Sequence, residues 1–282
     1  MWDIWELENK VKELKEIVIH MTSKAGTGHV TSSFSCAELM TVLYYGDILR
    51  YNPSDYNWSG RDYFILSKGH ANPILYAILA DLGFIDKSEL ELFCQPGGKL
   101  GVLLRGNIPG AEITSGSLGC GLGIAAGISK ALKLDRKQNK VFCMLGDAEC
   151  REGAVWEAAM YIGSAQLNNL ITIVDRNYLG ATHFIEEEAG INPFDDKWTA
   201  FGFETRHIDG HNIKNIKEAI GDIRCIKSKK TIVIIADTIK GKGVSFIENI
   251  PFMHGVAIKP DKVDAAITEI RKGSGYNGTI NA

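Results

Sequence analysis

Two polar positions thirty residues apart carry side chains that could bind a metal ion beside an anion. Asp147 follows the apolar run VFCML, and Asn177 comes shortly after the apolar run LITIV. These runs predict two parallel strands joined by a helix over 151–166, and a right-handed crossover returns the second strand beside the first. Asp147 and Asn177 should therefore converge at the carboxyl ends of the strands, where ligands bind in open α/β sheets.

This convergence would give a set of hard oxygen ligands. The Asp147 carboxylate, the Asn177 amide oxygen and the Leu179 carbonyl suit Mg²⁺ when a diphosphate fills the remaining positions. The amino end of the helix expected from about Arg151 points to the same place and favours an anion there. The spacing alone leaves a structural interpretation open, because Gly-Asp is common turn chemistry and an asparagine after a strand often caps a helix.

The rest of the chain supplies the elements that must position these groups. Short apolar runs predict buried strands at 64–67, 141–145, 170–174, 203–208 and 231–237. Helical patterns between them, such as 151–166 and 213–227, predict a doubly wound, mostly parallel α/β sheet with helices on both faces. We expect residues 1–282 to form a single domain with an amphipathic amino-terminal helix and a short frayed tail. That helix is expected over residues 1–20, with an apolar stripe of Ile4, Leu7, Val11, Leu14 and Val18.

The composition is that of an ordinary soluble globular protein. Hydrophobic residues make up 45% and charged residues 23%, and the net charge of −3 without a basic block argues against nucleic acid as a partner. No apolar run is long enough to span a membrane, and the amino terminus lacks the anatomy of a signal peptide. The six cysteines are scattered without CxxC pairs, as expected for reduced thiols in a cytoplasm.

Four further blocks resemble successive segments of the transketolase family. They are KAGTGHVTSSFSCAELMTVLYY (24–45), RDYFILSKGHANPILYAILADLGF (61–84), IPGAEITSGSLGCGLGIAAGISKAL (108–132) and DTIKGKGVSFIENIPFMHG (237–255). The segment from Gly146 to Asn177 resembles the family's thiamine diphosphate motif, a GDG followed by a distant asparagine, with Ala148 in place of the last glycine. Over nearly all of its length the chain is similar to the separately encoded amino-terminal subunit of a split transketolase.

The resemblance implies thiamine diphosphate and Mg²⁺ as cofactors and a role for individual residues. The implied metal ligands are Asp147, Asn177 and the Leu179 carbonyl; the implied cofactor-binding residues are His70, Gly116, Leu118, Gly146, Ala148 and Asn177; and the residues implied in catalysis are His29, His254 and Glu152, the last at a subunit contact. Imidazoles suit this work, because they donate to sugar hydroxyls and exchange protons near neutral pH.

The implied reaction is transfer of a two-carbon ketol unit from a ketose donor to an aldehyde acceptor. In this family a cofactor-activating glutamate comes from a second, pyrimidine-binding domain. The chain is therefore expected to be half an enzyme that needs a carboxy-terminal transketolase subunit, in an α₂β₂ assembly formed through helices at 118–132 and 153–166. Two alternatives stay open: the α subunit of a ketoacid decarboxylase or dehydrogenase complex, and a non-catalytic binding module on a degenerate copy of this domain.

One departure from the family pattern concerns the substrate. Transketolases usually carry a further histidine in a GHP segment before the PG-x-E block, and here the interval 96–110 contains none. That histidine normally helps to hold the donor ketose. Its loss is compatible with ketol transfer and predicts weaker use of the common donor xylulose 5-phosphate, with Arg105 as a candidate for compensation.

Overall fold

A five-stranded parallel sheet forms the centre of the molecule. The computed structural model describes residues 2–221, 223 and 230–273. The strands are β1 (Tyr63–Leu66), β2 (Val141–Gly146), β3 (Leu170–Arg176), β4 (Glu204–Asp209) and β5 (Ile232–Asp237). Their spatial order is β1-β2-β3-β5-β4, and every neighbouring pair is parallel. All five predicted strands are therefore present, and the α/β fold class is confirmed.

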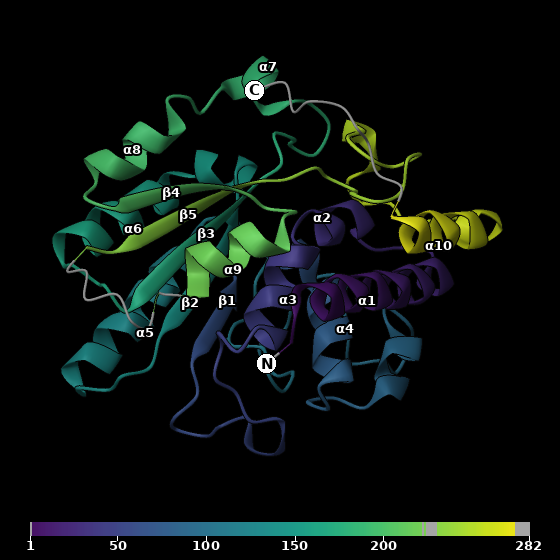
Figure 1. The fold of residues 1–282 in the computed structure, drawn as a ribbon, viewed down its shortest axis with the longest axis horizontal. Helices are drawn as coiled ribbons and strands as arrows, with labels where there is room; N and C mark the ends of the chain where they lie inside the picture. Colours follow the sequence, from purple (N-terminus) through teal and green to yellow (C-terminus); the bar gives the residue numbers. More distant parts are fainter. Residues whose placement is uncertain (1, 222, 224–229, 274–282) are drawn as a thin grey trace.

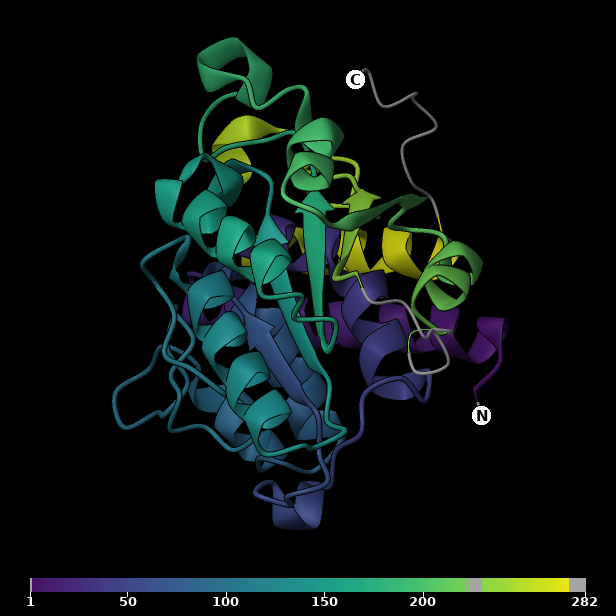
Figure 2. The ribbon, with the colours of Figure 1, turned by 90° about the vertical axis from the view of Figure 1, so that its left-hand side faces the viewer.

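Helices cover both faces of this sheet (Figures 1 and 2). They are α1 (Ile4–Ala25), α2 (Val30–Ser35), α3 (Ala37–Tyr45), α4 (Asn72–Asp81), α5 (Cys120–Leu134), α6 (Gly153–Ser164), α7 (Ile185–Ala189), α8 (Phe194–Ala200), α9 (Ile213–Gly221) and α10 (Val263–Lys272). Alternation along β2 feeds two cores, because Phe142 and Met144 pack with α1, α3 and α4, whereas Cys143 and Leu145 pack with α5, α6 and α8. The doubly wound arrangement follows from this alternation.

The amino-terminal helix differs from its prediction at both ends. It runs from Ile4 to Ala25, and Asp3 caps it in a reciprocal capping box with Glu6. Four predicted stripe residues, Leu7, Val11, Leu14 and Val18, are buried, but Ile4 is 41% exposed because it lies in the first turn, before the helix meets the core. In Figure 1, α1 lies beside α10, and Arg271 of α10 bonds to Glu16 of α1.

Two other predicted segments extend past the described residues. Helix α9 is described as far as Gly221, so the remainder of the predicted helix over 213–227 lies largely outside the described residues, and so does most of the predicted frayed tail. Within the described part of the chain, no helix has both the length and the apolar character that a membrane crossing requires.

Strand register places the polar loops at one edge of the sheet. Gly146 pairs with Asp175 at the ends of β2 and β3, and Arg176 pairs with Asp237 at the ends of β3 and β5. The residues that follow these strands therefore emerge side by side at the carboxyl edge.

Candidate active site

Asp147 lies at the centre of this edge, in the loop after β2. It is 1% exposed; its Oδ1 accepts a hydrogen bond from the Ala148 N–H at 2.8 Å and its Oδ2 accepts one from the Tyr178 N–H at 2.5 Å. The Asp147 N–H donates to the Asp175 carbonyl at 3.2 Å. Burial, and then the charge of Asp175, raise the pKa of Asp147 to about 7. A cation beside this carboxylate would offset both effects.

Asn177 and Leu179 approach from the loop after β3. Asn177 Nδ2 donates to Asp175 Oδ2 at 3.4 Å, and Asn177 Oδ1 accepts from the Leu179 N–H at 3.1 Å. These two bonds orient the amide and leave a lone pair of its oxygen for a further partner. The structure thus brings together Asp147, Asn177 and Leu179, the residues that the sequence predicts as metal ligands.

Two buried lysines, neither of which the sequence reasoning identified, border the same edge. Lys68 forms an ion pair with Asp175, which raises the pKa of Lys68 to about 12 although burial opposes the charge. Lys240 donates to the Gly180 carbonyl at 2.7 Å and to His254 Nδ1 at 2.9 Å. Burial, and then the charge of Lys68, lower the pKa of Lys240 to about 8. An anion bound here would relieve the repulsion between these cations.

Three imidazoles gather beside the lysines. The ring centroids of His29, His70 and His254 are 5.2, 5.1 and 5.0 Å apart in pairs. Burial, and then the lysine charges, lower the pKa of His29 to about 4 and of His254 to about 3, and hold that of His70 well below its usual value. All three rings are therefore neutral at pH 7. The Nδ1 of His29 is buried without a hydrogen-bond partner in the described structure, and such an orphaned polar atom indicates a ligand position.

Glu149 is a further site residue that the sequence reasoning missed. Its buried carboxylate accepts hydrogen bonds from Ser67 Oγ, from the Gly119 N–H at 2.8 Å and from the Gly146 N–H at 3.1 Å. These donors belong to three separate sequence blocks, so one side chain holds three walls of the site together. Burial raises the pKa of Glu149. Nothing local distinguishes it from a solvated acid in a helix's first turn.

The helix after β2 begins later than predicted. A 3-10 turn occupies Ala148–Arg151, and α6 starts at Gly153. Asp147 caps that turn, so the Ala148 N–H is bonded to the Asp147 carboxylate instead of being free for a phosphate. The amino end of α6, which the sequence leads us to expect beside the anion, therefore lies at Gly153, just past this turn. Ala148 has no positive φ, so an alanine adopts this loop conformation without strain.

The segment before α5 forms another wall. Ser115 packs so tightly on Gly69 that a Cβ at Gly69 would lie 1.7 Å from its Oγ. Gly119 has a φ of +87°, and a Cβ there would lie 2.7 Å from the Glu152 Cβ. Glu152 is exposed, as is Gly116, whereas Leu118 is half-buried. These three predicted residues surround the turn that leads into α5, and their place in the site depends on that turn.

These residues fit thiamine diphosphate and a divalent cation. A Cβ at Gly146 would make only ordinary van der Waals contact, at 4.0 Å from Glu149 Cβ and Lys68 Cδ, so no side chain packs tightly on this backbone. Among the described residues no group of three or more His, Cys, Asp or Glu side chains could hold a metal ion. A cation at Asp147 would therefore need amide, carbonyl and phosphate oxygens as further ligands. Mg²⁺ commonly binds in this way, through few carboxylates and the phosphates of a ligand.

Comparison with known proteins first identifies the family to which this domain belongs. A family model described as "Transketolase, thiamine diphosphate binding domain" matches residues 7–279. The chain belongs to the transketolase family. The 6-deoxy-6-sulfo-D-fructose transketolase subunit SqwG of Clostridium sp. (strain MSTE9) is 34% identical, over 95% of this chain and 97% of that protein. An apulose-4-phosphate transketolase subunit from Actinobacillus succinogenes is 36% identical, over 94% and 96%.

Other relatives are transketolases more than twice as long as this chain. Mouse transketolase is 36% identical over 94% of this chain but only 42% of its own length. A crystal structure of transketolase from Campylobacter jejuni superposes with a TM-score of 0.89 at 29% identity, over 96% of this chain and 43% of that one. The chain thus spans less than half of these transketolases and nearly all of the subunit relatives.

These relationships confirm three of the sequence-based predictions. The chain is a transferase of the transketolase type, its domain is of the thiamine diphosphate-binding kind, and it is one component of a two-component enzyme with a partner subunit. The alternative of a ketoacid dehydrogenase α subunit finds no support, because the matched family and these relatives are transketolases.

Proposed function

We propose that the carboxyl edge of the sheet binds the diphosphate of thiamine diphosphate through Mg²⁺, for ketol transfer completed by a carboxy-terminal transketolase subunit. The observation that carries this proposal is the convergence of a buried carboxylate, Asp147, with two buried lysines and three neutral imidazoles. Asp147, Asn177 and the Leu179 carbonyl would hold the metal. The raised pKa of Asp147 means that metal binding releases protons below about pH 7.

The diphosphate would lie between the metal and the lysines. Gly146 and Ala148 would border the diphosphate on one side, with their N–H groups bonded to the Glu149 and Asp147 carboxylates, and His70 would face it from the other side. Lys240 adds the positive charge that the sequence reasoning did not assign, and its lowered pKa shows how poorly that charge is balanced in the protein alone. Gly116 and Leu118 would border the aminopyrimidine.

The imidazoles of His29 and His254 would bind the hydroxyl groups of the sugar substrate. The cofactor, when bound, supplies the carbon nucleophile and the electron sink for ketol transfer. His29 and His254 are neutral, so each ring has one N–H donor and one acceptor nitrogen. The Lys240 ammonium occupies Nδ1 of His254, which leaves the Nε2–H of this ring to face the substrate.

The partner would cover the exposed face of α5 and α6. These helices contact each other and expose large apolar side chains, namely Ile124 at 41%, Leu134 at 71%, Met160 at 57% and Tyr161 at 46%. An apolar face of this kind suits an obligate interface, and Glu152, at the amino end of α6, would lie beside the cofactor there. We infer an α₂β₂ assembly, with residues 1–282 as a single domain.

The substrate proposed is a specialised ketose. Two subunit relatives are named for 6-deoxy-6-sulfo-D-fructose and for apulose 4-phosphate, and neither is the common donor. In place of the missing histidine, the loop at 101–105 presents Val102 at 37% and Leu103 at 41% exposure, with Arg105 exposed beside them. Comparing kcat/KM over a panel of ketose donors tests this proposal, and a clear preference for xylulose 5-phosphate would contradict it.

The cellular location proposed is the cytoplasm. All five cysteines in the described residues are free, including the exposed Cys120, and free thiols persist in a reducing compartment.

Substitution of Asp147 tests the metal and cofactor site directly. In the chain reconstituted with its partner subunit, Asp147→Ala should lower Mg²⁺-dependent affinity for thiamine diphosphate by about 100-fold or more, as measured by titration calorimetry. The matched control is Asp135→Ala at the exposed end of α5, which should bind like the wild type. Undiminished binding by Asp147→Ala would contradict the site. Full ketol transfer by the isolated chain would contradict the requirement for a partner.

A further inference from the structure

Tyr178 holds an unusual backbone conformation between the two loop residues proposed as metal ligands. Its φ is +63°, in the left-handed region, which is unfavourable for a residue with a bulky side chain. Asn177 precedes it and Leu179 follows it. Such strained residues persist only where the surrounding structure holds them, and they concentrate at functional sites.

Side-chain and backbone hydrogen bonds together hold Tyr178 in this conformation. Its hydroxyl donates to Asp237 Oδ1 at 2.5 Å, while its backbone N–H donates to Asp147 Oδ2, also at 2.5 Å. The guanidinium of Arg176 lies over the ring, 4.9 Å from its centroid. The residue therefore joins Asp147, at the end of β2, to Asp237, at the end of β5.

A ring of side chains fixes Asp237 in turn. His207 Nε2 lies 2.6 Å from Asp237 Oδ2, and His207 Nδ1 lies 3.0 Å from Asp195 Oδ1. Asp195 Oδ2 accepts from Arg176 at 3.3 Å, and Arg176 returns to the ring of Tyr178. The network runs through β4, α8 and β3, outside the cofactor-binding groups.

We infer that Tyr178 is a positioning residue for the divalent cation. Its hydroxyl bond to Asp237 fixes the left-handed turn, and the turn aims the Tyr178 N–H at Asp147 while presenting Asn177 and the Leu179 carbonyl on the same side. Tyr178 itself touches neither metal nor cofactor. This inference rests on the proposed metal site at Asp147.

The test measures Mn²⁺ affinity in the presence of thiamine diphosphate, by electron paramagnetic resonance of the free ion, with the chain and its partner subunit. Tyr178→Phe removes only the hydroxyl and should raise the Kd for Mn²⁺ by about tenfold, the usual effect of losing a bond to a charged acceptor. A merely structural tyrosine would lower the melting temperature without changing this Kd. Tyr51→Phe, which removes a hydroxyl bonded to the Tyr44 carbonyl at 2.8 Å, is the matched control.

A double-mutant cycle sharpens the test. Asp237→Ala should weaken Mn²⁺ binding as Tyr178→Phe does. The double variant should bind no worse than the poorer single variant, because both substitutions break the same hydrogen bond between Tyr178 and Asp237. Additive losses, or a Tyr178→Phe affinity equal to that of the Tyr51→Phe control, would overturn the inference. Asp147→Ala separates the two claims: if it retains Mn²⁺, the proposed metal site fails, whereas if it alone loses Mn²⁺, only the role of Tyr178 fails.

Discussion

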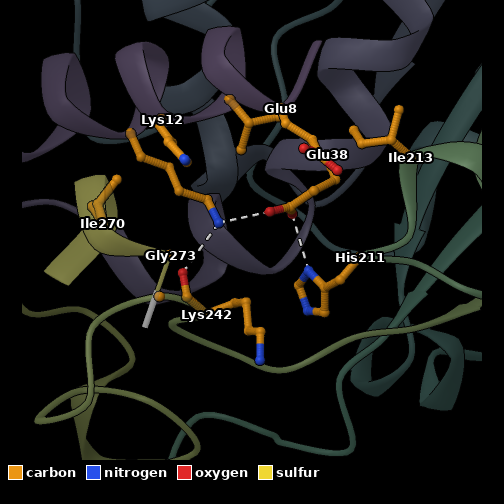
Figure 3. A pocket seen from close by; sticks show the side chains of 11 residues that line it. Glu8, Lys12, Glu38, His211, Ile213, Lys242, Ile270 and Gly273 are labelled. Carbon is orange, nitrogen blue, oxygen red and sulfur yellow. Dashed lines mark hydrogen bonds and ion pairs between the residues drawn. The ribbon is translucent and has the colours of Figure 1, made fainter. Parts of the chain in front are cut away.

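Two of the regions in which the described residues bury charged groups differ in how well those charges are paired. The first is the cofactor edge, at Asp147, Lys240 and the three imidazoles. The second, which we name the Glu38 cluster, comprises Lys15, Glu38 and His211, between α1, α3 and the loop after β4. Figure 3 shows the Glu38 carboxylate and the His211 ring pointing toward one another beside a cavity of about 320 Å³.

In the Glu38 cluster the charged groups have partners. Lys15 Nζ bonds to Glu38 Oε1 at 2.8 Å and to the Lys242 carbonyl at 3.1 Å. His211 Nε2 accepts from the Ile239 N–H at 2.8 Å, so its Nδ1 carries the proton donated to Glu38 Oε2 at 3.0 Å. Although burial opposes it, this pairing lowers the pKa of Glu38 to about 2. The ionised Glu38 carboxylate is therefore stabilised by the protein's own side chains.

At the cofactor edge the shifts run the other way. The pKa of Asp147 is raised and those of Lys240 and the imidazoles are lowered, so the charged form of each group is less favourable here than in water. A bound cation and diphosphate would reverse these effects, whereas the Glu38 cluster has nothing to gain from a ligand. Unsatisfied charge therefore identifies the site better than the presence of a cavity does.

The largest expected effect is on stability, at the Glu38 cluster. Glu38→Ala leaves Lys15 buried without a counter-charge, which should lower the free energy of unfolding by about 3–5 kcal/mol. Urea denaturation followed by circular dichroism measures this change, with Glu218→Ala at an exposed i,i+4 pair as the control. Cofactor affinity of the folded protein should change far less. A Glu38→Ala variant that is stable but does not bind the cofactor would mean that the Glu38 cluster belongs to the functional site.

Lys240→Met should give the opposite pattern. Removing a buried cation with a lowered pKa should not reduce the free energy of unfolding, because that charge is unfavourable in the folded protein. Cofactor affinity should nevertheless fall by about 10–100-fold, since a charge-assisted contact to the diphosphate is lost. Calorimetric titration and urea denaturation of the same samples check both halves, with the exposed Lys87→Met as the control. Lower stability with unchanged affinity would mean that Lys240 is structural.

The two regions should also respond to acid in different pH windows. His29 and His254 have pKa values lowered to about 4 and about 3, so the stability that these neutral rings contribute is lost as pH falls from about 6.5 toward 4 and 3, respectively. The pKa of Asp147, raised to about 7, opposes part of this loss. The lowered pKa of Glu38 makes its contribution disappear only between about pH 4.5 and 2. Melting temperature against pH, without cofactor, measures both windows.

Matched variants assign the windows. His254→Gln should flatten the profile above about pH 4, and Glu38→Gln should flatten it below about pH 4.5. If each variant changed the other's window, the contrast between the two regions would be wrong.

Sequence reasoning succeeded where the signal was local and failed where it was not. Apolar runs gave all five strands, and parallel-strand geometry then brought Asp147 beside Asn177. Lys240 and Glu149 were missed because an exposed and a buried lysine or glutamate look alike in a sequence. Their roles arise from partners far along the chain: Gly180 is 60 residues from Lys240, and Gly119 is 30 from Glu149.

The smallest effect is expected at Cys150, which lies next to Glu149 in sequence. Its thiol is buried and bonds to the Gly146 carbonyl at 3.4 Å, and burial raises its pKa well above the usual value, so it remains protonated and unreactive. Cys150→Ala should keep kcat and cofactor affinity within about twofold, because the lost thiol bond is weak.

The neighbouring Glu149→Gln variant supplies the contrast at the same loop. A glutamine can accept through only one of its two terminal atoms, so an amide nitrogen would face either the Gly146 N–H or the pair of donors from Ser67 and Gly119. An unpaired buried donor costs about 1–3 kcal/mol, which predicts about a tenfold or greater loss of cofactor affinity as the walls of the site separate. Thiol alkylation and steady-state kinetics check Cys150, and calorimetry checks Glu149. A larger loss at Cys150 than at Glu149 would mean that the thiol, and not the carboxylate, supports the cofactor edge.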